Sequence, residues 1–111
     1  RTGKGGLAAV AVVRTVRDGS VSTWAQYTIR TRSKDRGTVV ASLKDKGVPT
    51  AIYYPNPLHR QTAYKHFPVA GNGLPVSDRV AQDVFSLPMH AYLEADDQAY
   101  IIESVREALA A

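Results

Sequence analysis

The sequence predicts a small α/β domain, a sandwich of one short β-sheet with about three packed helices. Two observations support this fold class. Stretches with the two-residue alternation of strands and stretches with the helical spacing of apolar residues follow one another in the order β-α-β-α-α. The chain of 111 residues, 44% of them hydrophobic, is long enough for one domain with a modest core.

The first 21 residues are expected to form a flexible arm and linker, and the domain to occupy residues 22–111. Residues 1–6 are small, basic and rich in glycine, so they bury little apolar surface. Residues 7–16 fit a short helix or a strand, because their periodicity does not separate the two. Asp18-Gly19-Ser20 predicts a turn. Since the chain begins at Arg1 without an initiator methionine, we expect a fragment of a longer protein.

Two strands are predicted in the first half of the domain. Residues 22–32 alternate between an apolar face, which carries Ile29, and a largely polar face, which carries Arg30 and Arg32. Residues 48–54 form the second strand. A strand, a helix and a strand with short connections indicate a βαβ unit with a right-handed crossover, and they allow an antiparallel strand between the two.

Three helices are predicted. The first begins after Asp35, whose carboxylate can accept a free backbone N–H, and ends near residue 46 before Gly47. The second begins at Ser77 and is stopped by the segment Leu87-Pro88-Met89. The third covers about residues 95–110, with acidic side chains near its start that suit the helix dipole. The residues expected to face the core are Val39, Val40 and Leu43, then Val80, Ala81, Val84 and Phe85, and finally Ile101, Ile102, Val105 and Leu109.

Composition excludes several classes of protein. The longest apolar run, residues 7–13, is far shorter than the ~18–20 residues of a membrane helix, so no membrane partner is expected. The chain has no cysteine, which excludes disulfides and thiolate metal sites and fits a cytoplasmic location. His66 and His90 each lack a second ligand at metal spacing, so we expect no metal site.

The segment 51–65 carries the strongest functional signal, because it places Tyr53, Tyr54 and His59 where a predicted strand runs into a loop. Pro55 and Pro57 fix their own φ angles and restrict the residues before them, so the loop is stiff. A stiff loop that carries phenols and an imidazole suits binding through hydroxyl groups and ring faces. The alternative is that both tyrosines fill an edge of the core and His59 fixes a turn.

A basic run at Arg30, Arg32, Lys34 and Arg36, together with a net charge of +4, raises a second hypothesis. In this hypothesis the chain is a free-standing basic α/β module that binds nucleic acid through the strand face that carries Arg30 and Arg32. Runs of this kind are usually solvated faces, and Trp24 is the one aromatic residue that shares the predicted face. Nucleic acid is therefore the weaker prediction.

Five patterns occur together in an order typical of one enzyme family. They are Tyr-Thr-Ile-Arg at 27–30, Asp-Arg at 35–36 with Leu43 and Gly-Val at 47–48, Tyr-Tyr-Pro-x-Pro-Leu-His-x-Gln-x-Ala-Tyr at 53–64, Leu-Pro-Val-Ser at 74–77 and Phe-Ser-Leu-Pro-Met-His at 85–90. In this order they resemble the C-terminal domain of the DegT/StrS-type nucleotide-sugar aminotransferases. The resemblance covers about residues 24–108.

The resemblance implies the small domain of a fold-type-I enzyme that depends on pyridoxal phosphate. Members of the family move an amino group from glutamate to a keto carbon of a nucleotide-linked sugar, and they act as homodimers. The products serve the biosynthesis of cell-surface polysaccharide, lipopolysaccharide or antibiotic sugars. In the resembling enzymes the loop equivalent to residues 52–59 contributes to the sugar-nucleotide pocket, which makes Tyr53, Tyr54 and His59 the expected substrate-binding residues.

The same resemblance implies that the catalytic parts lie in an N-terminal domain missing from this chain. The family's Schiff-base lysine belongs to that domain, and no lysine here matches its motif. We therefore expect no catalytic residue, no bound pyridoxal phosphate, no turnover and a monomeric state for the isolated 111 residues. An exposed lysine near its usual pKa of about 10.4 is mostly protonated and a poor nucleophile.

Overall fold

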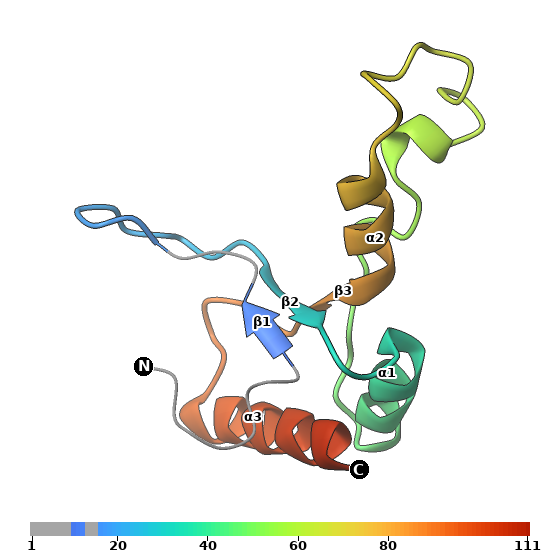
Figure 1. The fold of residues 1–111 in the computed structure, drawn as a ribbon. Helices are drawn as coiled ribbons and strands as arrows, with labels where there is room; N and C mark the ends of the chain where they lie inside the picture. The colour runs from blue at the N-terminus through green and yellow to red at the C-terminus, as the bar shows by residue number, and fades with distance from the viewer. Residues whose placement is uncertain (1–9, 13–15) are drawn as a thin grey trace.

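A three-stranded antiparallel sheet lies at the centre of the structure, a computed structural model that describes residues 10–12 and 16–111 (Figure 1). The strand order is β1-β2-β3, where β1 is Val10–Val12, β2 is Tyr27–Thr31 and β3 is Val84–Leu87. Val10 lies opposite Thr31, and Ile29 lies opposite Phe85. The packing of helices on one small sheet confirms the α/β fold class, although the elements do not follow one another in the predicted order β-α-β-α-α.

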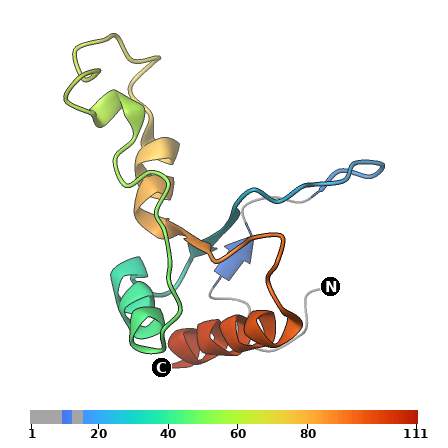
Figure 2. The ribbon, with the colours of Figure 1, turned by 180° about the vertical axis from the view of Figure 1, so that it is seen from behind.

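The core lies between this sheet and two helices, α1 (Arg36–Asp45) and α3 (Ala95–Ala110), which pack side by side (Figure 2). The buried side chains that form it are Ile29, Val39, Leu43, Val48, Phe85 and Ala108. Helix α2 (Pro75–Asp83) leads directly into β3 and extends away from the sheet. Within the described residues, every helix is too short or too polar to cross a membrane.

The first predicted strand is shorter in the structure than in the sequence analysis, which had it begin at residue 22. Strand β2 begins at Tyr27, because Trp24 has a φ of 47°. That left-handed backbone is incompatible with an extended strand. The alternation within β2 is confirmed, since Ile29 and Thr31 are buried and Arg30 between them is only partly so.

The second predicted strand, residues 48–54, is reduced to a single bridge. The Ala51 N–H donates to the Ser86 carbonyl at 3.1 Å, and the Ser86 N–H donates to the Ala51 carbonyl at 2.7 Å. Pro49 has no N–H to extend this ladder. Because β3 is antiparallel both to β2 and to this segment, residue 51 runs parallel to β2 with β3 between them. This is the intervening antiparallel strand that the sequence allowed.

Helix α1 follows its prediction. The Asp35 carboxylate accepts a hydrogen bond from the Thr38 N–H at 2.9 Å, which caps the first turn. Gly47 has a φ of 74°, the left-handed conformation that ends a helix most easily at glycine. Val39 and Leu43 are fully buried, and Val40 is half-buried beside them.

The second predicted helix was wrong at both ends. Helix α2 begins at Pro75, and it stops at Asp83, so Val84 and Phe85 are buried as strand residues rather than as helix residues. The Arg36 guanidinium donates to the carbonyls of Ala81 and Val84 at this junction. Pairing with β2 gives residues 84–87 the hydrogen bonds that a longer helix would otherwise supply.

The last helix has the predicted span, but its buried stripe is shifted. Ser104 and Ala108 are buried, and Ile101, Val105 and Leu109 pack partly against the core. Ile102 was expected to face inward, and it is 46% exposed. Successive residues are turned by about 100° around a helix, so Ile102 lies beyond the edge of the face that Ile101 and Val105 share.

The segment expected to be arm and linker contains β1, which settles the choice between helix and strand for residues 10–12. The predicted turn is confirmed, since the Ser20 N–H donates to the Arg17 carbonyl at 3.0 Å and Gly19 has a φ of 78°. The flexible residues expected at 1–6 lie outside the described residues. The domain boundary at residue 21 stays a prediction.

Leu43→Ala should lower the free energy of unfolding by about 2–5 kcal/mol, because it removes a fully buried side chain and leaves a cavity. Leu58→Ala is the matched control, because Leu58 is 63% exposed and the change should stay within about 0.5 kcal/mol. Urea unfolding followed by circular dichroism measures both. Equal losses in the two variants would contradict this packing.

Candidate functional site

Tyr53 lies at the wall of a cleft of about 290 Å³ beside the sheet. The cleft is lined by residues 25–26, 49–51 and 86–89 together with Tyr53. Both residues of the Ala51–Ser86 bridge line the cleft. The backbone pairing that completes the sheet therefore also holds the chain at Ala51, two residues before Tyr53. The cleft therefore joins the end of β3, the approach to β2 and the tyrosine segment.

Both tyrosines of the segment are exposed. Tyr53 is 47% exposed and Tyr54 is 71% exposed, and their ring centroids are 6.0 Å apart in an edge-to-face arrangement at 73°. Neither ring belongs to the buried cluster. Two phenols close together on the surface offer hydroxyl donors and acceptors next to apolar ring faces.

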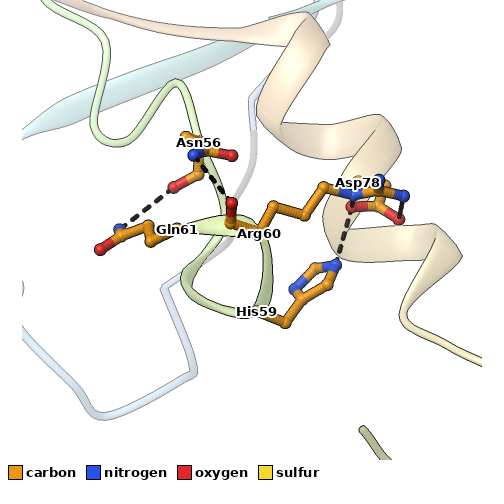
Figure 3. A network of polar contacts seen from close by, with 5 residues as sticks. All are labelled: Asn56, His59, Arg60, Gln61 and Asp78. Carbon is orange, nitrogen blue, oxygen red and sulfur yellow. Dashed lines mark hydrogen bonds and ion pairs between the residues drawn. The ribbon is translucent and has the colours of Figure 1, made fainter. Parts of the chain in front are cut away.

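His59 does not lie with the tyrosines at the cleft. It belongs to a 3-10 turn, Leu58–Arg60, that packs on the first turn of α2 (Figure 3). Its Nε2 donates to Asp78 Oδ1 at 2.8 Å, and its side chain is 15% exposed. The structure thus brings together Tyr53 and Tyr54 and places His59 at the other end of the loop.

Asp78 is the residue of this region that the sequence analysis missed. Arg60 donates to both of its oxygens, from Nε at 2.6 Å and from Nη2 at 2.7 Å, so that the arginine and the histidine share one carboxylate (Figure 3). The hydrogen bond from Arg60, helped by the one from His59, lowers the pKa of Asp78 from 3.8 to about 2. We call Asp78, Arg60 and His59 the ionic cluster.

Side-chain amides hold the loop backbone near the ionic cluster. Asn56 Nδ2 donates to the Arg60 carbonyl at 3.3 Å, and Gln61 Nε2 donates to the Asn56 carbonyl at 3.3 Å (Figure 3). The loop is therefore attached at two ends, by the bridge at Ala51 and by the ionic cluster. This geometry agrees with a turn-fixing part for His59, the alternative that the sequence left open.

Three of the four residues of the basic run make contacts within the fold, whereas Arg32 is exposed. Arg30 forms an ion pair with Asp83 at 2.7 Å. Arg36 donates to two carbonyls at the end of α2, and Lys34 donates to the Ala108 carbonyl at 3.5 Å at the end of α3. Cations at helix C-termini are favoured by the helix dipole. These contacts support a structural part for the run and weaken the nucleic-acid hypothesis.

The cleft beside Tyr53 does not fit a pyridoxal phosphate site. That cofactor needs an amine for a Schiff base and cationic or N–H groups for its phosphate. The cleft wall contains no lysine, arginine or histidine among its described residues. Lys46 pairs with Glu107, whose hydrogen bond raises the pKa of Lys46 and makes its amine a weaker nucleophile. No group of three metal-ligating side chains occurs in the described part either.

A model of the DegT/DnrJ/EryC1/StrS aminotransferase family matches residues 4–106. UDP-2-acetamido-2-deoxy-3-oxo-D-glucuronate aminotransferase of Pseudomonas aeruginosa is 48% identical over 75 residues, which are 68% of this chain and 20% of that protein. The dTDP-3-amino-3,4,6-trideoxy-alpha-D-glucose transaminase of Micromonospora megalomicea is 37% identical over 95 residues, 85% of this chain and 25% of that protein.

Solved structures agree with the sequence relatives. A crystal structure of a DegT DnrJ EryC1 StrS aminotransferase from Brucella abortus superposes with a TM-score of 0.83 at 44% identity. The match covers 93% of this chain and 27% of that one. The chain therefore spans about a fifth to a quarter of the length of the proteins it matches.

Arg60→Gln should raise the pKa of Asp78 from about 2 toward 3.8, because it removes the largest cause of the depression. Because folding lowers the pKa of Asp78, its ionised carboxylate stabilises the fold fully at pH values above its ordinary pKa of 3.8. This stabilisation is lost as the pH falls from 3.8 through about 2. NMR detection of the Asp78 side-chain carbon during an acid titration measures the midpoint.

Arg79→Gln is the matched control for this titration, because it removes the same charge one residue from Asp78 without breaking a hydrogen bond of the ionic cluster. Its midpoint should stay near that of the unaltered chain. A midpoint of 3.8 in the unaltered chain would show that Asp78 is not paired in solution.

Proposed function

Because the chain belongs to the DegT/DnrJ/EryC1/StrS aminotransferase family, we propose that it is the C-terminal, substrate-facing domain of an aminotransferase that transfers an amino group from glutamate to a keto nucleotide-sugar. The observation that carries the proposal is the exposed pair Tyr53 and Tyr54, with Tyr53 at the wall of a cleft. The relatives named above act on UDP- and dTDP-linked sugars, which supports this class of substrate.

The two phenols suit a sugar ligand. A tyrosine hydroxyl both donates and accepts, as sugar hydroxyls require, while the ring covers the apolar C–H face of the sugar. We include His59 in the proposed site with a narrower part. Since its Nε2–H is donated to Asp78, its Nδ1 is left to accept a hydrogen bond from a sugar hydroxyl or, when the ring is protonated, to donate one to a phosphate oxygen.

Enzymes of this family depend on pyridoxal phosphate, which supplies the electron sink for amino transfer when bound. The cleft wall has no lysine, arginine or histidine among its described residues, so in our proposal the cofactor is held by a separate N-terminal domain of the whole protein. This chain then orients the sugar and helps to exclude water. We further propose a cytoplasmic homodimer for the whole protein and a monomer for the 111 residues alone.

The isolated chain should transfer no amino group when it is mixed with pyridoxal phosphate, glutamate and a keto nucleotide-sugar. The reason is that Lys34 and Lys46 are engaged in contacts within the fold and the cleft wall has no amine among its described residues. A coupled assay for 2-oxoglutarate measures turnover. Product formation above the rate of cofactor alone would contradict the proposal.

A chimaera gives the tyrosines an activity readout. In it, this chain replaces the matching segment of the Pseudomonas aeruginosa aminotransferase, and the substrate is UDP-2-acetamido-2-deoxy-3-oxo-D-glucuronate. Tyr53→Phe should lower kcat/KM for the sugar about 2- to 10-fold, the range expected for one lost hydrogen bond, and Tyr54→Phe should act likewise. KM for glutamate should change less.

Tyr92→Phe is the control in the same chimaera, because Tyr92 is 87% exposed and does not line the cleft. It should leave kcat/KM unchanged. If Tyr53→Phe and Tyr54→Phe behave like Tyr92→Phe, the tyrosine pair has no part in sugar binding.

A further inference from the structure

Both ends of the tyrosine loop, residues 51–60, are held by one continuous element. At the start of the loop, Ala51 exchanges two backbone hydrogen bonds with Ser86 of β3. The ionic cluster holds the other end to Asp78 of α2. Helix α2 runs directly into β3, so no flexible connection lies between the two anchor points (Figure 1).

The junction between α2 and β3 is braced by side chains from other elements. The Thr31 hydroxyl of β2 donates to the Asp83 carbonyl at 3.2 Å, and the Arg36 guanidinium of α1 donates to the Val84 carbonyl at 3.2 Å. Arg30 of β2 forms its ion pair with the carboxylate of Asp83. These contacts stiffen the element that carries both anchor points, so the tyrosine loop spans a rigid frame.

The two attachments differ in what they need from the sequence. The bridge at Ala51 uses backbone groups only. The other end depends on one side chain, since the two oxygens of Asp78 accept all three hydrogen bonds of the ionic cluster (Figure 3). The hydrogen bond from Arg60 lowers the pKa of Asp78 to about 2, so the carboxylate is ionised at neutral pH. Hydrogen bonds to an ionised acceptor are stronger than those between neutral groups.

Tyr53 and Tyr54 take their positions from the backbone of the tyrosine loop. Both rings are exposed and lie outside the buried cluster. Without the attachment at Asp78, the loop would be fixed at Ala51 alone. The two tyrosines would then sample more conformations, and a ligand that orders them would have to offset the lost entropy.

We propose that Asp78 is a positioning residue for the nucleotide-sugar, because through Arg60 and His59 it holds the tyrosine loop in the arrangement that the sugar meets. This inference rests on the proposed function. Asp78 itself makes no contact with the sugar. It reduces the conformational freedom that the phenols lose on binding, so its contribution lies in the binding of the sugar rather than in the chemical step.

Asp78→Asn tests this part in the chimaera, because it keeps the shape of the side chain and removes its charge. KM for the UDP-linked sugar should rise about 2- to 10-fold, kcat should change by less than about 2-fold, and KM for glutamate should stay the same. Asp97→Asn is the matched control, because Asp97 is also a carboxylate in the first turn of a helix and is exposed. An unchanged KM for the sugar, or a fall in kcat as large as the rise in KM, overturns the proposal.

A double-mutant cycle shows whether Asp78 acts through the tyrosines. Tyr53→Ala with Tyr54→Ala removes both exposed rings. In that background Asp78→Asn should raise KM for the sugar by less than about 2-fold, because the groups that Asp78 positions are gone. A rise of the same size in both backgrounds means that Asp78 acts on another part of the protein, which also overturns the proposal.

NMR relaxation of the backbone amides in the isolated chain measures the positioning without any ligand. In Asp78→Asn the order parameter of the Tyr54 N–H should fall from about 0.85 to below about 0.6 on the picosecond-to-nanosecond timescale. The N–H groups of Ala51 and Phe85 should keep their values, because the bridge and the sheet remain, and they show that the variant is folded. An unchanged order parameter at Tyr54 contradicts the positioning role.

The relaxation measurement needs no sugar, so it separates this inference from the proposed function. If Asp78→Asn loosens Tyr54 but Tyr53→Ala with Tyr54→Ala leaves KM for the sugar unchanged, the attachment stands and the proposed sugar contact is wrong. If the tyrosine variant raises KM and Asp78→Asn leaves Tyr54 ordered, the sugar contact stands and the positioning role is wrong.

Discussion

The position of β3 between β2 and Ala51 is the constraint on which the rest of the structure depends. Strand β3 pairs with β2 from Leu87, which lies opposite Tyr27, to Val84, which lies opposite Arg30. Its Ser86 also exchanges hydrogen bonds with Ala51. Its Phe85 is fully buried between the sheet and the helices. Because the same short strand closes the core and anchors the segment before the tyrosines, the stability of the fold and the shape of the cleft have a common origin.

The tyrosine loop, residues 51–60, has two attachments and a middle that is exposed. Ala51 ties its start to the sheet, and the ionic cluster ties residues 59 and 60 to α2. Tyr53 and Tyr54 lie between these points and remain exposed. A loop held at both ends presents side chains to a ligand with little loss of conformational entropy.

Local signals in the sequence predicted the two ends of α1 correctly. Asp35 and Gly47 mark α1 because a side-chain cap and a left-handed residue act within one turn of chain. The stretch 84–87 was assigned to a helix, because its spacing continues the stripe of α2 and pairing with β2, more than fifty residues earlier in the sequence, is invisible in a local pattern. Asp78 was missed as the partner of His59 for the same reason, since the two are nineteen residues apart.

The most direct measurement of the central claim is a crystal structure of the chimaera with its UDP-linked sugar bound. The account predicts that the hydroxyl oxygen of Tyr53 or Tyr54 lies about 2.6–3.2 Å from an oxygen of the sugar or its phosphates. If both phenols face bulk solvent, with the ligand bound elsewhere, the tyrosine loop is a structural turn and the substrate-facing role of this domain is contradicted.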